Sequence, residues 1–175
     1  LFVFLGAFFY AIVYTVWLKR RTWLNIVFGG LAGSWAVLAG ATAADPQLGA
    51  VPLALALVLF LWTPPHFWSL AIAFRDDYAA AGVPMLPVVV GDQRAANTIF
   101  ASTLALVAAS LLPLAFGLGP IYLVGAAIGG FLFIQKAWLL TRQPNRKTAM
   151  VCFHASLMQL TLVLCAAIVD TQLRF

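Results

Sequence analysis

Long apolar runs dominate this sequence and limit what it can fold into. An α-helix of about twenty apolar residues crosses the hydrocarbon core of a bilayer. A spanning segment must also pair all of its backbone polar groups, and a helix does this internally. Six runs of this kind cover residues 1–18, 25–44, 50–74, 97–116, 120–140 and 150–170. The sequence therefore predicts an all-α, multi-pass membrane protein.

Composition supports this prediction and excludes an ordinary soluble domain. Of the 175 residues, 64% are hydrophobic and 9% are charged, whereas a soluble domain is about half apolar and about a quarter charged. The chain starts at Leu1 inside an apolar run, without an initiator methionine or a targeting signal. We therefore expect one transmembrane domain over residues 1–175 whose N-terminal part is missing from the sequence.

Basic residues are distributed unevenly between the two ends of the predicted spans. Nine fall at one end: Lys19, Arg20, Arg21, Arg75, Arg94, Lys136, Arg142, Arg146 and Lys147. The other end has Arg174, together with Asp45 and Asp170. Because cytoplasmic loops are enriched in Lys and Arg, this split predicts cytoplasmic basic loops and an outside C-terminus. It also favours six spans, since one more or one fewer would scramble the distribution.

The longest loop between predicted spans, residues 75–96, has the clearest polar cluster. It contains Arg75, Tyr78 and three of the five acidic residues in the chain, Asp76, Asp77 and Asp92. Adjacent carboxylates suit Mg²⁺, which is commonly held by one or two carboxylates plus the phosphate oxygens of a substrate. The structural alternative is a solvated turn in which Asp76 caps a short helix.

Lys19, Arg20 and Arg21 form a second polar cluster, predicted at the same membrane face. One interpretation is a topology anchor in contact with lipid headgroups. The other is an anion clamp, because cations and carboxylates on one face together suit a metal–diphosphate complex.

The third run contains LFLWTPPHFWSLAIAF, residues 59–74, where a double proline precedes a histidine. Pro64 and Pro65 cannot donate hydrogen bonds, so we expect a break that lines a cavity or is buried in protein. His66 lies about 12 Å below the loop at about 1.5 Å per residue. A titratable residue inside a span indicates a functional site, with a packed core histidine as the alternative. His154, on a stripe with Met150 and Met158, fits packing better.

Three segments resemble the protoheme IX farnesyltransferases, or heme O synthases, of the UbiA superfamily. They are YTVWLKRRTWLNIVFGG, FLWTPPHFWSLAIAFRDDYAAAGVPMLPVVVG and FHASLMQLTLVLCAAIVD. The resemblance implies a UbiA-like bundle of nine helices, of which this chain is the C-terminal six-helix fragment. It implies farnesyl transfer from farnesyl diphosphate to a vinyl group of heme B, with Mg²⁺ as the metal. Many relatives have a DxxxD motif in the second acidic loop, and this chain has Asp76-Asp77-Tyr78 without an acid four positions on.

The resemblance also implies roles for individual residues. Asp76 and Asp77 would hold Mg²⁺. Lys19, Arg20, Arg21 and Arg75 would contact the diphosphate. The aromatic side chains of Tyr14, Trp17, Trp62, Phe67 and Trp68 would line the prenyl channel, with interfacial belt residues as the alternative. Tyr78 would bind substrate. His66 would contact heme or take part in proton transfer.

Two further functions stay open at this point. One is a UbiA-type prenyltransferase that acts on an aromatic quinone precursor, and the other is a membrane transporter or scaffold without enzymatic activity. For the preferred function, the partners are heme B, farnesyl diphosphate, the bilayer and heme A synthase, with no nucleic acid. We expect a bacterial inner-membrane location, and we expect the fragment alone to be inactive.

Overall fold

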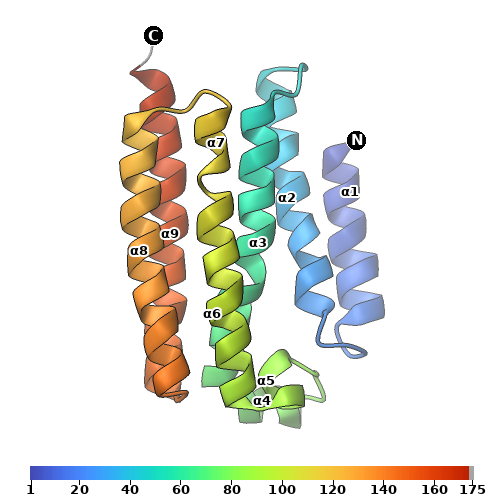
Figure 1. Ribbon diagram of the computed structural model, residues 1–175. Helices are drawn as coiled ribbons and strands as arrows, with labels where there is room; N and C mark the ends of the chain where they lie inside the picture. Colours follow the sequence, from blue (N-terminus) through green and yellow to red (C-terminus); the bar gives the residue numbers. More distant parts are fainter. Residues whose placement is uncertain (174–175) are drawn as a thin grey trace.

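Helices account for most of residues 1–173, the part of the chain that this computed structural model describes (Figure 1). No strand occurs within these residues, so the predicted all-α class is confirmed. The elements are α1 (Phe2–Phe8), the π-helix η1 (Phe9–Leu18), α2 (Asn25–Ala44), α3 (Ala50–Ala73), α4 (Arg75–Ala80), α5 (Leu86–Val90), α6 (Asp92–Ala109), α7 (Leu112–Ala115), α8 (Pro120–Arg142) and α9 (Arg146–Gln172).

Five helical segments of residues 1–173 are long and apolar enough to cross a membrane: Asn25–Ala44, Ala50–Ala73, Asp92–Ala115, Pro120–Arg142 and Arg146–Gln172. The first apolar helix, Phe2–Leu18, is shorter than these five. The predicted totals of six spans here and nine in the whole protein therefore stay predictions.

Two helices begin earlier than the apolar runs predicted, because their first turns are polar. α6 starts at Asp92, directly after Gly91, whose φ of 82° ends α5. α9 starts at Arg146 behind a capping box, in which the Asn145 side chain accepts from the Thr148 backbone and the Thr148 hydroxyl accepts from the Asn145 backbone. Capping satisfies backbone donors that a helix start otherwise leaves unpaired. Hydropathy alone does not detect such turns.

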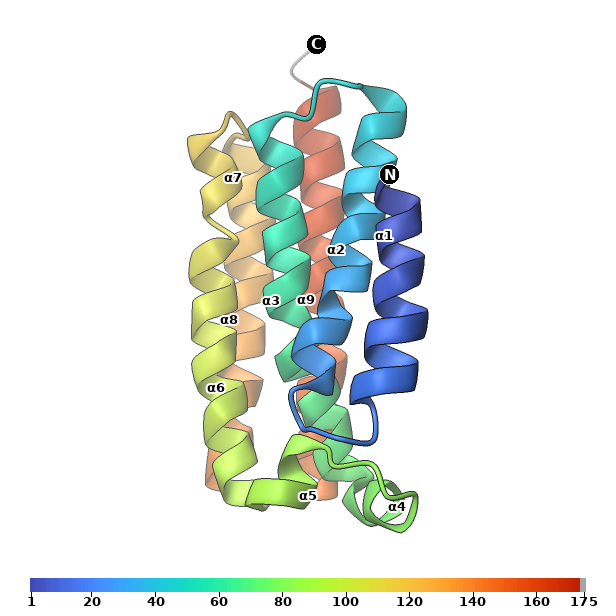
Figure 2. The ribbon, with the colours of Figure 1, turned by 90° about the vertical axis from the view of Figure 1, so that its right-hand side faces the viewer.

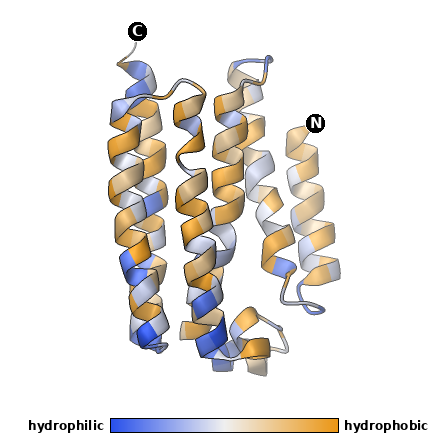
Figure 3. Cartoon of the chain, in the orientation of Figure 1, coloured by the Kyte–Doolittle hydropathy of each residue, from blue (hydrophilic) through white to orange (hydrophobic). Residues whose placement is uncertain are grey.

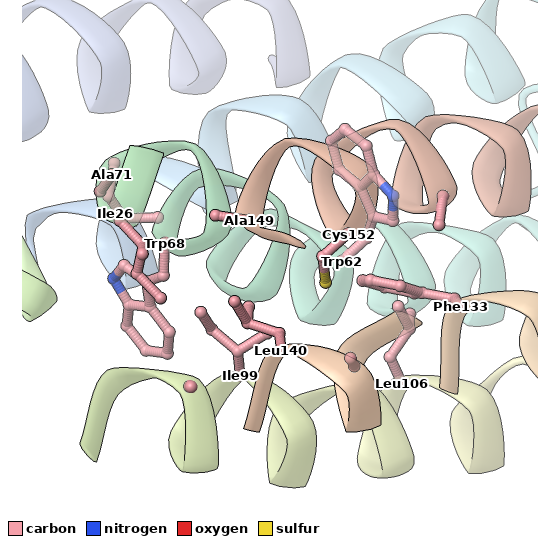
Figure 4. Close-up of a cluster of buried hydrophobic side chains, with 14 of the residues drawn as sticks. Ile26, Trp62, Trp68, Ala71, Ile99, Leu106, Phe133, Leu140, Ala149 and Cys152 are labelled. Carbon is pink, nitrogen blue, oxygen red and sulfur yellow. The ribbon is translucent and has the colours of Figure 1, made fainter. Parts of the chain in front are cut away.

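The long helices run alternately up and down, and α3 is central to them (Figures 1 and 2). It packs against α2 on one side and against α6 and α9 on the other, while α8 packs on α6 and α9. Figure 4 shows the resulting core, where side chains from α3, α6, α8 and α9 point toward one another. Ile99, Leu106, Phe133 and Leu140 have no exposed surface there. The N-terminal α1–η1 helix contacts mainly α2.

The double proline does not break α3, which corrects one expectation. The helix continues from Ala50 to Ala73 with both prolines inside it, and both prolines are buried. Prolines are tolerated within membrane helices where neighbouring groups adjust to the missing backbone donors. Two nearby hydroxyls bond other carbonyls of this helix: Thr63 donates to the Leu59 carbonyl and Ser69 donates to the Pro65 carbonyl.

Polar side chains concentrate at one end of the bundle, which is the lower end in Figure 3. This end contains the η1–α2 loop, α4, the start of α6 and the α8–α9 turn. At the other end, the buried Asp170 carboxylate accepts backbone N–H bonds from Gly119, Ile121 and Tyr122 at the start of α8. Asp170 thus stabilises a helix terminus. Arg174, predicted for that end, lies outside the described residues.

Candidate functional site

A cavity of about 400 Å³ lies between η1, α2 and α3. This volume falls in the range of about 300–1,000 Å³ that is typical of small-molecule sites. Its lining residues are Tyr10, Tyr14, Lys19, Ile26, Gly29, Gly30, Ala32, Gly33, Leu59, Trp62, Thr63 and Phe67. Lys19 is the only charged residue among them, so the cavity combines a mostly apolar wall with one cation.

Glycines on α2 allow side chains of η1 and α3 to approach the α2 backbone closely. A Cβ atom at Gly29 would lie 2.8 Å from Cδ2 of Tyr14, and one at Gly30 would lie 3.0 Å from Cβ of Thr63. Both distances are too short for an ordinary contact. The Tyr14 ring therefore rests directly on the α2 backbone, where it forms part of the cavity wall.

The cation lies at the end of the cavity nearest the polar loops. Lys19 follows η1 directly, and its Nζ lies 5.9 Å from the centre of the Tyr14 ring. Asn25, buried at the start of α2, holds this loop, since its Nδ2 donates to the carbonyls of Lys19 and Thr22 at 3.2 and 2.7 Å. Sequence reasoning missed Asn25. A polar residue directly after a basic loop was the available signal.

Four of the seven predicted substrate-binding residues line this cavity: Tyr14, Lys19, Trp62 and Phe67. Arg20 and Arg21 are exposed in the adjacent loop, and Tyr78 is half-buried on α4. Tyr78 packs against the hydrophobic core. Burial raises the pKa of Tyr78 above its ordinary value of 10.0.

Two other predicted channel residues do not line the cavity. Trp17 is 55% exposed on the outer side of η1, a position that suits the interfacial belt. Trp68 is buried and packs against Trp23, with ring centres 6.1 Å apart. Neither ring is among the lining residues of this cavity, and a role in the prenyl channel stays a prediction.

The predicted acidic site lies on α4, at the same end of the bundle as the η1–α2 loop (Figure 2). Asp76 and Asp77 occupy the first turn of this helix, and both are exposed. Arg75 does not face them; its Nη1 pairs with Oδ2 of Asp92 at 3.3 Å. Within residues 1–173, no group of three or more acids, histidines or cysteines gathers at a possible metal site.

His66 lies behind the cavity wall rather than in its lining. Its ring stacks between Trp62 and Phe153, with centres 4.0 and 4.5 Å away, and meets Phe67 edge-on at 4.9 Å. Its Nδ1 lies 2.7 Å from Oγ of Ser156. The Ser156 hydroxyl donates its one proton to the Phe153 carbonyl, so Nδ1 must be the donor to Ser156. The ring therefore carries a proton on Nδ1.

Ser156 is a second residue that sequence reasoning missed. Besides its contact with His66, its backbone carbonyl accepts a hydrogen bond from Nε1 of Trp62 at 2.8 Å. One residue of α9 thus fixes both a cavity-lining ring and the histidine behind it. His154, by contrast, is exposed, and its Nδ1 lies 2.7 Å from the carbonyl of Met150.

Comparisons with known proteins agree with the helical architecture. The family model described as "UbiA prenyltransferase family" matches residues 1–162. A solved structure of digeranylgeranylglyceryl phosphate synthase shares 22% identity and the fold, with a TM-score of 0.70, over 97% of this chain and 60% of that chain.

Curated relatives are more similar in sequence. "Protoheme IX farnesyltransferase 2" of Paramagnetospirillum magneticum is 63% identical over 97% of this chain and 59% of the relative. "Protoheme IX farnesyltransferase 1" of Cenarchaeum symbiosum is 44% identical over 99% of this chain and 59% of the relative. The chain therefore spans about three fifths of the length of these relatives.

Proposed function

The chain belongs to the UbiA prenyltransferase family, and from this premise we propose that its protein transfers a farnesyl group from farnesyl diphosphate to a vinyl group of heme B. The products are heme O and diphosphate. The observation that carries the proposal is the apolar cavity with Lys19 at its polar end, which suits an apolar chain with an anionic head. The names of the curated relatives support heme B as the acceptor.

Each part of farnesyl diphosphate has matching chemistry in the chain. The prenyl tail lies in the cavity against Trp62 and Phe67, where burial of apolar surface stabilises it. The diphosphate lies at the polar end, next to Lys19. Arg20 and Arg21, exposed in the same loop, and Arg75 on α4 supply further positive charge.

Mg²⁺ is the metal generally used by this family for diphosphate, and Asp76 and Asp77 are the residues that would hold it. Two exposed carboxylates in one helical turn fit a metal that takes one or two carboxylates and completes its shell with water and phosphate oxygens. When bound, Mg²⁺ supplies charge neutralisation of the leaving diphosphate.

The chemistry is an allylic substitution followed by hydration. The bond between farnesyl C1 and the diphosphate oxygen breaks, and the diphosphate leaves with the electron pair. The heme vinyl group supplies the electrons of the new carbon–carbon bond to C1. Water then adds to the resulting cation and loses a proton, which leaves the hydroxyl group of heme O. Lys19 stabilises the developing negative charge, and the rings of Tyr14 and Trp62 stabilise the allylic cation by cation–π contact.

His66 acts in this reaction from behind the wall, through heme contact or by supporting Trp62. In the complete gene product, His66→Ala is expected to lower heme O formation while the amount of protein in the membrane stays the same. Normal turnover by this variant would show that the ring only packs.

A direct assay tests the proposed function. Membranes with the complete gene product are supplied with farnesyl diphosphate, Mg²⁺ and heme B, and heme O is measured by mass spectrometry. A parallel reaction offers 4-hydroxybenzoate as the acceptor. Heme O in the first reaction alone is expected. Prenylated 4-hydroxybenzoate would instead identify a quinone-precursor enzyme, and no consumption of farnesyl diphosphate would favour a transporter or scaffold.

The same proposal includes a location and a partner. The polar end of the bundle, with nearly all of the basic residues, faces the cytoplasm of a bacterial inner membrane. Heme O then passes to heme A synthase. Labelling of single cysteines introduced at residues 20 and 45 from the two sides of the membrane tests this orientation.

A further inference from the structure

The cavity extends away from the polar loops, and the lining residues of three segments define its two ends. Lys19, Ile26 and Phe67 are the lining residues nearest the polar loops on η1, α2 and α3. The lining residues farthest from those loops are Tyr10, Gly33 and Leu59. At about 1.5 Å per residue, Phe67 and Leu59 lie about 12 Å apart along α3, and Ile26 and Gly33 about 10 Å apart along α2.

Gly33 and Leu59 meet at this far end. A Cβ atom at Gly33 would lie 3.3 Å from Cδ2 of Leu59, so the leucine side chain touches the α2 backbone and fills the space that a larger residue at 33 would take. Leu59 is half-buried and packs against the hydrophobic core, which holds it in place.

We propose that Leu59 and Gly33 form the floor of the prenyl cavity and set the length of the isoprenoid chain that the protein transfers. The proposal rests on the proposed function, because it assumes that the diphosphate lies near Lys19 and the tail extends away from it. With the head fixed at one end, the last isoprene unit of the tail meets the Leu59 side chain. A longer tail must displace this side chain, and a shorter tail leaves the far end unfilled.

Substitutions at these two positions can either lengthen or shorten the cavity. Leu59→Ala removes most of the side chain and deepens the cavity, so it is expected to favour geranylgeranyl diphosphate, which is one isoprene unit longer than farnesyl diphosphate. Gly33→Leu adds nearly as much carbon as one isoprene unit, so it is expected to favour geranyl diphosphate, which is one unit shorter. A change of this size in an apolar pocket shifts preference by about tenfold or more.

Matched controls are available on the same two helices. Gly40 lies on α2 with no atom within 4 Å of a Cβ placed there, so Gly40→Leu adds the same side chain away from the cavity. Leu53 on α3 is 48% exposed and is not part of the lining, so Leu53→Ala removes the same side chain elsewhere. Neither control is expected to alter the preference.

The test is a competition assay with the complete gene product. Equal concentrations of geranyl, farnesyl and geranylgeranyl diphosphate are supplied with heme B, and the three prenylated hemes are quantified by mass spectrometry. The expected result is a shift in product ratio toward the longer chain in Leu59→Ala and toward the shorter chain in Gly33→Leu. Loss of stability alone lowers all three products in parallel and leaves the ratio unchanged.

Two failures are distinguishable in this assay. If the parent makes heme O but Leu59→Ala keeps the parental ratio, the floor is elsewhere and the proposal on chain length is overturned. Leu59→Ala decides this even if Gly33→Leu does not fold. If the parent transfers none of the three chains to heme B, the proposed function itself fails, and the proposal on chain length fails with it.

Discussion

Glycines on α2 and on α8 face different kinds of neighbour. On α8, a Cβ atom at Gly129 would lie 3.1 Å from Cα of Gln159, and one at Gly125 would lie 2.4 Å from Cβ of Ala166 and 3.0 Å from the carbonyl oxygen of Leu162. These glycines bring two backbones together. On α2, by contrast, Gly29, Gly30 and Gly33 would meet the side chains of Tyr14, Thr63 and Leu59.

The α8–α9 contact is therefore the scaffold, and the α2 contacts with η1 and α3 belong to the candidate site. Backbones cannot move aside without moving whole helices, so the α8–α9 contact is rigid. The α2 contacts with η1 and α3 are made by side chains, so a substitution there changes the shape of the cavity without moving a helix. α3 belongs to both regions, because Trp62 lines the cavity while its Nε1 donates to Ser156 on α9. Substitutions on the α8–α9 side should therefore reduce stability, and those around the cavity should reduce or redirect activity.

The largest expected effect is on the scaffold side. Gly129→Leu places a side chain against the α9 backbone, which cannot relax, and we expect a loss of about 3 kcal/mol or more in the free energy of unfolding. Denaturant unfolding in detergent measures this loss of stability. Gly40→Leu, which adds the same side chain where nothing lies within 4 Å, is the control. Equal stability of the two variants would contradict the separation of scaffold and site.

A large effect on activity alone is expected at α4. Asp77→Asn removes a carboxylate that is exposed, and we expect about a 100-fold loss in kcat with an unchanged unfolding midpoint. The magnesium concentration for half-maximal rate should rise as well. Asp45→Asn is a control for loss of charge at the other end of the bundle, where Asp45 accepts from the Gln47 backbone. Normal turnover over a magnesium titration would exclude a metal role for Asp77.

The helices and one side of the cavity were predictable from sequence, and physical reasons separate what was found from what was missed. Apolar length locates α2 and α3 because the bilayer demands it. Tyr14 and Lys19 stood out because they belong to the basic end of the first apolar run, and Trp62 and Phe67 because they flank Pro64, Pro65 and His66. The starts of α6 and α9 were missed because the first turns of both helices are polar.

Contacts between distant segments could not be derived from a single sequence. Ser156 lies 90 residues from His66, and nothing in the local pattern of α9 indicates their hydrogen bond. Gly33 and Leu59 are equally ordinary in sequence, and their meeting depends on how α2 packs on α3. The double proline predicted a break that does not occur, because neighbouring helices bury the segment and keep α3 continuous.

A smaller effect is expected where the two regions join. Ser156→Ala leaves the buried Nδ1–H of His66 without an acceptor, which is expected to cost about 1–3 kcal/mol in the free energy of unfolding. The double variant His66→Phe with Ser156→Ala removes both partners, so it should lose less than the sum of the single variants. Strict additivity in this double-mutant cycle would mean that the two side chains do not interact.

The smallest expected effect concerns Tyr78, and it tests whether this side chain packs against the hydrophobic core. Burial raises the pKa of Tyr78 above 10.0 in the folded protein, so the unfolded chain loses this proton first as the pH rises. Below pH 10 both states keep the proton, and Tyr78 adds no pH dependence. Above pH 10, the free energy of unfolding should fall as the pH rises in the parent, and it should fall less steeply in Tyr78→Phe. Urea unfolding between pH 8 and about 11 measures the difference. Parallel curves would mean that Tyr78 is solvated and is not packed against the hydrophobic core.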